Sequence, residues 1–378
     1  ASLMSGIYPT ATRYKAYTSQ VQEDTPGAKT LAQIFKDNGY ITLSRGKIFH
    51  NPKDSDSVSW SEPAWRAKAP KWLDPETGRI LSKPKKRGRI YELPDVADNA
   101  YADGMVAEKV IKDLKNCKKT GKPFFIACGF VKPHMPFYAP KKYWDLYDRT
   151  AITQPENYNY IPRNAPKVSI SDWGEMRTYS NIPKRGQVSD SIAIDLIHGY
   201  YATVSYTDAL IGKVLQELKN QQLDQNTIIV LVSDHGYNLQ EHTQWAKFTN
   251  YNTSTQIPLI IYNPLAKSKG STDALTSLVD VYPTLAELCS LEVPGNQLDG
   301  TSVVPILNNP NLEGKKHIFI KKSNGFTLKT KDFSYTEFIK PQDNLTLSTM
   351  LYDHRTTKNE NENIAHLKAY KKDRKSVV

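Results

Sequence analysis

The side chains best suited to chemistry follow an apolar run at residues 227–233. That run breaks into Asp234, His235 and Gly236, and Lys247 lies a short distance further along the chain. A carboxylate and an imidazole side by side can hold a divalent cation, and a lysine can neutralise an oxyanion bound next to that cation. An aspartate at a strand end can also simply cap the following turn. We interpret Asp234 and His235 as candidate metal ligands.

The same pattern occurs twice more, earlier in the chain. The apolar residues 40–43 are followed by Lys47 and His50, and the apolar residues 123–129 are followed by His134. Each of these residues taken singly could be an ordinary surface side chain. If the strands lie parallel and side by side, their carboxyl ends share one edge of a sheet, where ligands bind in open α/β folds. The three groups together then form an oxyanion site.

Strands and helices alternate through about residue 300. We expect strands at 40–43, 123–129, 227–233 and 257–262, and helices at 29–38, 98–116, 190–222 and 279–291. This alternation predicts an α/β fold, in which helices flank a central, mostly parallel sheet. Short strand-like runs separated by charged and turn residues follow. We therefore expect a large domain over residues 1–310 and a small antiparallel sheet subdomain over residues 311–378.

Two long irregular segments, 51–95 and 138–188, interrupt the alternation. Long loops inside a compact domain are usually functional or disordered, and the aromatic residues here argue against disorder. The first segment holds the basic run 83–89, which by itself is more typical of a solvated loop. We expect both segments to shape a substrate pocket.

Composition limits the class of partner. The 378 residues carry a formal net charge of +11, and the pI is about 9.2. A basic surface favours nucleic acid, an anionic membrane or an acidic polysaccharide, unless the charge has no specific role. No stretch approaches the ~18 apolar residues of a membrane span. The three cysteines lie far apart, and their odd number supports no disulfide framework.

The chain resembles type I sulfatases of the alkaline-phosphatase-like superfamily, most closely the iduronate-2-sulfatase branch. The segments that carry the resemblance are FKDNGY at 35–40, GKIFH at 46–50, KPHMPF at 132–137, YATVSY at 201–206, SDHG at 233–236, EH at 241–242, WAK at 245–247 and LYD at 351–353. They cover nearly the whole chain. Each is weak singly, and together they are highly specific.

The resemblance implies roles for the candidate residues. Asp234 and His235 would bind one divalent cation, which is Ca²⁺ in most of the family. Lys47 and Lys247 would hold the sulfate oxygens and neutralise the charge that develops on them. The larger domain would then be the catalytic one.

The resemblance also assigns the acid and base. His134, with Lys247, would protonate the leaving alcohol, and His50 would accept the proton of the nucleophile. The family's nucleophile is a formylglycine made from the Cys or Ser of a Cys/Ser-x-Pro-x-Arg motif. A segment resembling residues 1–9 follows that motif in the family. We therefore expect the nucleophile and the other metal ligands to lie before Ala1, outside these residues.

The function expected from this resemblance is hydrolysis of sulfate esters on a sulfated polysaccharide or oligosaccharide. A glycosaminoglycan or an algal glycan such as ulvan or carrageenan would suit the positive charge. The alternatives are a phosphate or phosphonate ester hydrolase of the same superfamily and a non-catalytic sulfated-glycan-binding protein. We expect a secreted or periplasmic protein with no nucleic-acid partner and no integral membrane segment.

Overall fold

The computed structural model describes residues 1–70, 72–74, 77, 87–266, 268–340, 342 and 345–370. Residues 83–86 of the expected basic run lie outside the described residues.

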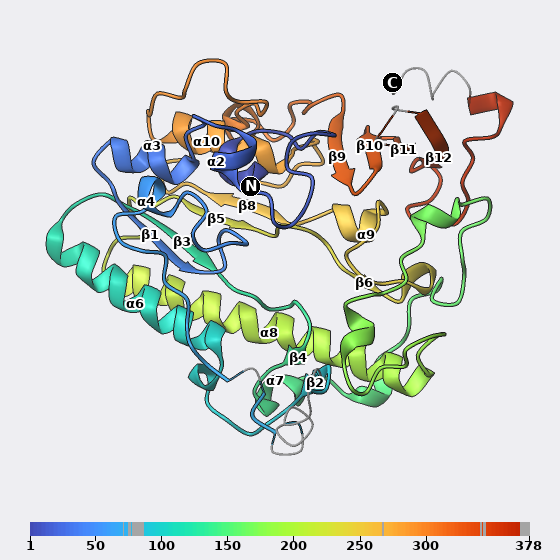
Figure 1. Cartoon of the computed structure of the whole chain (residues 1–378). Coiled ribbons are helices and arrows are strands. Elements are labelled where there is room, and N and C mark those ends of the chain that lie inside the picture. The colour runs from blue at the N-terminus through green and yellow to red at the C-terminus, as the bar shows by residue number, and fades with distance from the viewer. Residues whose placement is uncertain are drawn as a thin grey trace.

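Four strands form the centre of the molecule (Figure 1). Strand β1 (Ile41–Gly46) pairs in parallel with β3 (Phe124–Gly129), as the sequence predicted. Strand β5 (Ile229–Val232) pairs with β8 (Leu259–Tyr262) in the antiparallel sense. An antiparallel strand is a common addition to a mostly parallel sheet. The predicted α/β architecture is thus present, with β8 running against its neighbour.

Helices cover both faces of these strands (Figure 1). The long helices α6 (Ala102–Thr120) and α8 (Asp190–Asn220) lie on one face, and α3 (Leu31–Asp37) and α10 (Val281–Leu288) lie on the other. Helix α8 begins at Ser189, whose side chain accepts a hydrogen bond from the backbone of Ile192 and so satisfies a free amide of the first turn. No helix in the described ranges is both long and apolar enough to cross a membrane.

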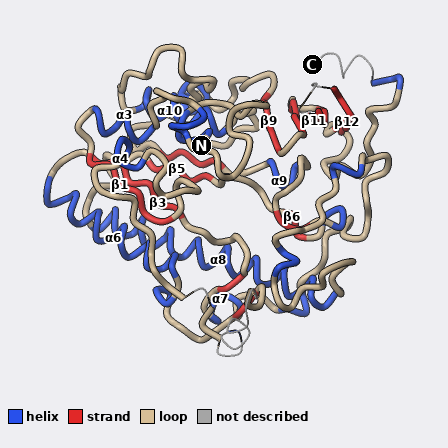
Figure 2. Tube along the Cα trace, viewed as in Figure 1, coloured by secondary structure: helices blue, strands red, loops and turns tan. Residues whose placement is uncertain are grey.

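Shorter elements complete the larger part of the chain, and loops join them (Figure 2). The short α-helices are α1 (Ser2–Ser5), α2 (Val21–Asp24), α4 (Asp56–Ser59), α7 (Lys141–Trp144), α9 (Asn252–Thr255) and α11 (Val304–Asn308). The short strands are β2 (Tyr91–Glu92), β4 (Phe137–Tyr138), β6 (Asn238–Leu239) and β7 (Trp245–Ala246). Single 3₁₀ turns are η1 (Asp98–Ala100), η2 (Arg149–Ala151), η3 (Lys167–Ser169), η4 (Met176–Thr178), η5 (Glu241–Thr243), η6 (Leu278–Asp280) and η7 (Lys368–Tyr370).

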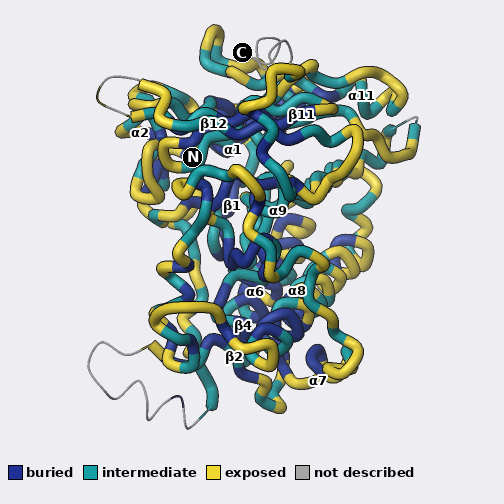
Figure 3. Tube along the Cα trace, turned by 90° about the vertical axis from the view of Figure 1, so that its right-hand side faces the viewer, coloured by how far each residue is buried: buried dark blue, intermediate teal, exposed yellow. Residues whose placement is uncertain are grey.

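The C-terminal part forms an antiparallel sheet in the order β12-β11-β10-β9, as the short strand-like runs of this part predicted. Its strands are β9 (Ile318–Lys322), β10 (Gly325–Lys329), β11 (Phe333–Lys340) and β12 (Leu345–Asp353). Tyr251 of the larger part packs with Phe338, Met350 and Tyr352 of this sheet. The sheet and the α/β part therefore share a core, and Figure 3 shows buried backbone continuing between them.

Candidate active site

The carboxyl ends of β1, β3 and β5 bring the predicted site residues together. These residues are Lys47, His50, His134, Asp234, His235 and Lys247. Lys47 is among the charges that lower the pKa of each of the other five, so all of them lie within its electrostatic reach. Parallel pairing of β1 and β3 explains part of this convergence, because both strands end at the same edge.

Two glycines fix the position of Lys47 behind β1. The backbone amide of Lys47 donates to the carbonyl of Gly129 at 2.8 Å. A Cβ atom on Gly46, where φ is +80°, would lie 2.1 Å from that same carbonyl oxygen. A Cβ atom on Gly129 would lie 2.2 Å from the carbonyl oxygen of Lys47. The two strand ends can approach this closely only without side chains at these positions.

Asp234 and His235 face each other directly after β5. The carbonyl of Gly236 accepts a hydrogen bond from Nδ1 of His235 at 2.7 Å, so Nδ1 carries the proton. The Nε2 atom is left with its lone pair, 3.5 Å from the Asp234 carboxylate. Burial would raise the pKa of Asp234, but His235, Lys47 and Lys247 outweigh it and lower that pKa.

The Asp234 and His235 pair fits a divalent cation. Burial lowers the pKa of His235, and with Nδ1 held by a backbone carbonyl the ring is oriented as in metal-bound histidines. A carboxylate and an imidazole lone pair that face each other are both electron donors, and a cation between them would satisfy both. Within the described ranges, no group of three or more His, Cys, Asp or Glu side chains could hold a metal ion.

Ala1 lies beside this pair. Its backbone nitrogen lies within the electrostatic reach of Asp54 and Asp234. Asp54 is buried, and its carboxylate accepts the backbone amide of Val21 at 3.0 Å. Asp54 could not be recognised from the sequence, because nothing in its local sequence distinguishes it from a loop aspartate.

Lys247 supplies a second cation opposite Lys47. Burial lowers its pKa first, and the charge of Lys47 adds to this effect. Asp234 and Glu175 act in the opposite direction. Two neighbouring ammonium groups are stabilised when an oxyanion binds between them.

His134 presents one ring nitrogen to the site. Its Nδ1 atom lies 2.6 Å from the carbonyl of Met135 and donates to it, which leaves Nε2 free to exchange a proton. Burial, followed by the charge of Lys247, lowers the pKa of His134 to about 3. The Glu175 carboxylate lies 3.8 Å from Nε2. The imidazole is therefore neutral at neutral pH, with a carboxylate beside it.

Asp103 and Lys132 form hydrogen bonds to the backbone of the loop that carries His134. The carboxylate of Asp103, buried in the first turn of α6, accepts the backbone amides of Val131 at 3.0 Å and Lys132 at 2.8 Å. The Nζ atom of Lys132 donates to the carbonyls of His134 and Pro136 at 2.7 and 2.6 Å. Lys132 thus braces the loop, although its strand-end position resembles that of the site residues.

His50 lies at the rim of the site. Burial lowers its pKa, and Lys47, Arg66 and Lys247 lower it further. A guanidinium nitrogen of Arg66 donates to the carbonyl of His50 at 3.1 Å. The ring of Tyr17 meets the His50 ring edge to face at a centroid distance of 5.1 Å. A histidine kept neutral in this way can accept a proton at neutral pH.

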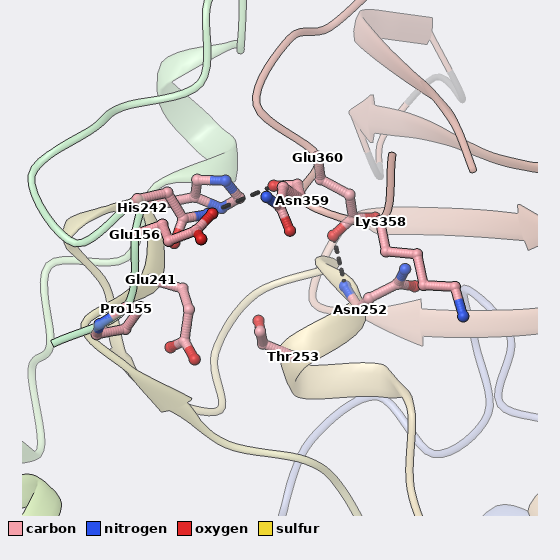
Figure 4. A pocket seen from close by; sticks show the side chains of 10 residues that line it. Pro155, Glu156, Glu241, His242, Asn252, Thr253, Lys358, Asn359 and Glu360 are labelled. Carbon is pink, nitrogen blue, oxygen red and sulfur yellow. Dashed lines mark hydrogen bonds between the residues drawn. The ribbon is translucent and has the colours of Figure 1, made fainter. Parts of the chain in front are cut away.

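A cavity of about 450 Å³ lies between the α/β part and the residues that follow β12, and none of the six site residues lines it. Glu156, Glu241, Glu360 and Lys358 are among its lining residues, and Figure 4 shows Glu241 directed into the open space. Three carboxylates against one ammonium make this cavity unsuited to a sulfate group. His242, on its wall, donates or accepts a hydrogen bond at 3.1 Å with the side chain of Asn361.

Sequence reasoning missed Asp103 and Glu175. Asp103 looked like an ordinary acidic residue in a first helical turn, where carboxylates are favoured by the helix dipole. Glu175 lies in the irregular segment 138–188, where no periodicity indicates which side chains point inward. Their roles depend on contacts with residues distant in the sequence.

In the comparison with known proteins, the sequence matches sulfatases. Residues 1–291 match the model of the sulfatase family. Iduronate 2-sulfatase of Homo sapiens is 31% identical over 335 residues, which cover 78% of this chain and 60% of that protein. A protein named sulfatase from Formosa agariphila is 28% identical over 367 residues, which cover 89% of this chain and 68% of that protein. The chain spans 60% of the length of the human relative.

Solved structures agree with the fold. One is a protein in complex with its substrate D-glucosamine-2-N,6-O-disulfate, with a TM-score of 0.74 and 20% identity over 100% of this chain and 85% of that one. A phosphonate monoester hydrolase from Silicibacter pomeroyi also has a TM-score of 0.74 and 20% identity, over 100% of this chain and 83% of that one. At this identity the likeness shows the fold alone. Because the family model matches more than half of its residues, the chain belongs to the sulfatase family.

Proposed function

We propose that this protein hydrolyses sulfate esters of a sulfated polysaccharide or oligosaccharide. The observation that carries the proposal is the meeting of Lys47 and Lys247 beside the Asp234 and His235 pair. The two ammonium groups, with a cation that the Asp234 and His235 pair would hold, would provide the positive charge that a sulfate ester requires in its transition state.

Each residue contributes a separate part of the reaction. Lys47 and Lys247 hold the sulfate oxygens and neutralise the charge that develops on them. Once the negative sulfate ester is bound and favours the protonated ring, His134 donates the proton on Nε2 to the leaving alcohol and keeps the Nδ1 proton on the carbonyl of Met135. His50 accepts the proton of the nucleophile, and its neutral ring suits that task.

The proposal also includes a divalent cation and a formylglycine, neither of which is part of residues 1–378. Asp234 and His235 would hold a divalent cation, with Ca²⁺ as our choice, and that ion would supply Lewis-acid stabilisation of a sulfate oxygen. A formylglycine before Ala1 would supply the nucleophile, and the position of Ala1 beside Asp234 supports this placement.

The substrate is proposed from charge and from the relatives. A net charge of +11 favours a polyanionic glycan such as a glycosaminoglycan, ulvan or carrageenan over a small neutral ester. Two relatives are named iduronate 2-sulfatase. One solved structure of similar fold is a complex with its substrate D-glucosamine-2-N,6-O-disulfate. Because such polysaccharides lie outside cells, a secreted or periplasmic location follows from the proposed substrate.

The experiment uses the full-length gene, expressed with a formylglycine-generating system. We expect release of inorganic sulfate from a sulfated oligosaccharide, loss of that release after chelation by EDTA, and recovery with Ca²⁺. Release of phosphate from phosphate or phosphonate esters without sulfate release would replace the proposal by the phosphoesterase alternative. Tight binding of sulfated glycan without hydrolysis, in protein shown by mass spectrometry to carry formylglycine, would indicate a non-catalytic binding protein.

A further inference from the structure

Two lysines of the C-terminal sheet lie close to the candidate active site. Lys321 and Lys322 end β9, before a turn of two residues that leads to β10. The Nζ atom of Lys322 lies 5.4 Å from the centre of the Phe248 ring, and Nζ of Lys247 lies 5.9 Å from the same centre. The distance between the Nζ atoms of Lys322 and Lys247 is therefore at most the sum of these two distances.

The charges around these lysines are of one sign. Burial lowers the pKa of Lys321 and Lys322, and each feels a further positive neighbour: Lys15 acts on Lys321, and Lys321 acts on Lys322. None of the ion pairs among the described residues involves any of these three lysines. Gathering partly buried like charges costs free energy, which a bound oxyanion would offset.

The surface between Lys322 and Lys247 suits a carbohydrate. Phe248 lies there with 40% of its area exposed, and the Lys321 ammonium lies 5.9 Å from the centre of another ring, Phe326. An exposed aromatic ring gives an apolar surface against which the C–H face of a sugar can pack. A glycan held at Lys247 would meet Phe248 on its way to Lys322.

We propose that Lys322 forms a second anion subsite that binds a sulfate or carboxylate group on a sugar neighbouring the one being desulfated. This inference rests on the proposed function and narrows its substrate to glycans that carry at least two anionic groups. Phe248 and Lys247 belong to the α/β part, and Lys322 belongs to the C-terminal sheet. The subsite therefore exists only when the two parts of the chain are joined.

The test compares two substrates in the full-length enzyme that carries formylglycine. One is a disulfated disaccharide, and the other is 4-nitrocatechol sulfate, which has a single sulfate ester. For Lys322→Gln we expect KM on the disaccharide to rise about tenfold, the effect of losing one charged hydrogen bond, with kcat unchanged. The kinetic constants for 4-nitrocatechol sulfate should stay as in the unchanged enzyme. Lys322→Arg, which keeps the charge, should restore most of the affinity.

Lys119→Gln is the matched control, since Lys119 is an exposed lysine at the far end of α6 (Figure 1). Equal losses on both substrates, or no loss on either, would overturn the subsite. A monosulfated disaccharide with a uronate carboxylate distinguishes a carboxylate ligand from a second sulfate. If the unchanged enzyme releases no sulfate from any substrate, the proposed function fails instead. The subsite is then tested by calorimetric titration with a heparin disaccharide, in which Lys322→Gln must bind more weakly than Lys119→Gln.

Discussion

His134 and Lys247 acquire their chemistry from the charges that surround them. Burial and positive neighbours lower the pKa of both, so each is less protonated in the free protein than in water. A bound sulfate ester would reverse part of this effect, because a negative charge stabilises the protonated forms. Substrate binding then helps to charge the residues that hold and protonate it.

The Lys247→Ala change should slow sulfate release without unfolding the protein. We expect kcat for sulfate release to fall about 10²–10³-fold, the effect of removing one donor to the developing charge. Thermal unfolding should change little, since removal of Lys247 also relieves its repulsion with Lys47. Unchanged turnover would exclude Lys247 from the reaction, and a lower unfolding temperature would mean that the loss of activity reflects misfolding.

Glu175→Gln tests the partner of His134. The carboxylate lies 3.8 Å from Nε2 and stabilises the protonated imidazole, so its neutralisation should lower the pKa of His134. As the proton donor, His134 must be protonated, and the alkaline limb of the kcat profile should shift to lower pH by about one unit. Lys47, Lys132 and Lys247 also face this ring and oppose its protonation.

The control for that experiment is Glu175→Asp, which keeps the charge and should keep the limb near its original position. A fall in kcat at every pH with no movement of the limb would mean that Glu175 only supports the loop. Glu175 also lies 3.7 Å from Arg87, and the Arg87→Gln change should leave the limb in place.

At the scale of elements, the site depends on strand ends and on one braced loop. Its strands could be predicted from the sequence, because runs such as 228–232 are wholly apolar and are followed by polar and turn residues. The antiparallel direction of β8 could not, since direction is a property of the connection and leaves no trace in a four-residue strand. The roles of Asp103 and Glu175 also required the three-dimensional contacts, whereas Asp234 and His235 followed from their position after a strand.

Asp103→Ala should show how much the loop depends on its anchor. It removes the buried acceptor of two backbone amides, and each unsatisfied amide costs about 1–3 kcal/mol. We expect lower stability in urea unfolding and a reduced kcat, because His134 loses its fixed position. Asp208→Ala, which removes an exposed aspartate on α8, should affect neither quantity. Normal kcat in folded Asp103→Ala would show that the loop holds its shape without this carboxylate.

In the molecule as a whole, the residues after β12 return to the α/β part and form hydrogen bonds that hold the C-terminal sheet against it. The backbone amide of Arg163 donates to the carbonyl of Asn361, and that of Asn363 donates to the carbonyl of Arg163, both at 2.9 Å. The Glu360 carboxylate accepts the amide of Asn252 at 2.7 Å, at the start of α9. Burial raises the pKa of Glu360 from 4.5 to about 7.

This raised pKa predicts how stability changes with pH. Between pH 4.5 and about 7 the folded protein keeps a proton on Glu360 that the unfolded chain has lost, so the free energy of unfolding falls as pH rises. Glu360→Gln imitates the protonated form and should remove this decline. The gain in the free energy of unfolding above pH 7 is at most about 3.5 kcal/mol, from ~1.4 kcal/mol for each pKa unit. Thermal unfolding at pH 5 and pH 8 measures it, and equal effects at both values would contradict the assignment.

The residues proposed to cleave the sulfate ester and the lysines proposed to select the glycan lie in different parts of the chain, because the latter precede the two-residue turn between β9 and β10. The groups proposed for bond cleavage all come from the α/β part, whereas Lys321 and Lys322 belong to a hairpin that contributes none of them. We therefore expect substitutions of Lys321 and Lys322 to change the affinity for the glycan while the groups for bond cleavage stay in place. Related organisms could adapt such an enzyme to a new food source by exchanging one hairpin, and transplanting hairpins between homologues offers the same route in the laboratory.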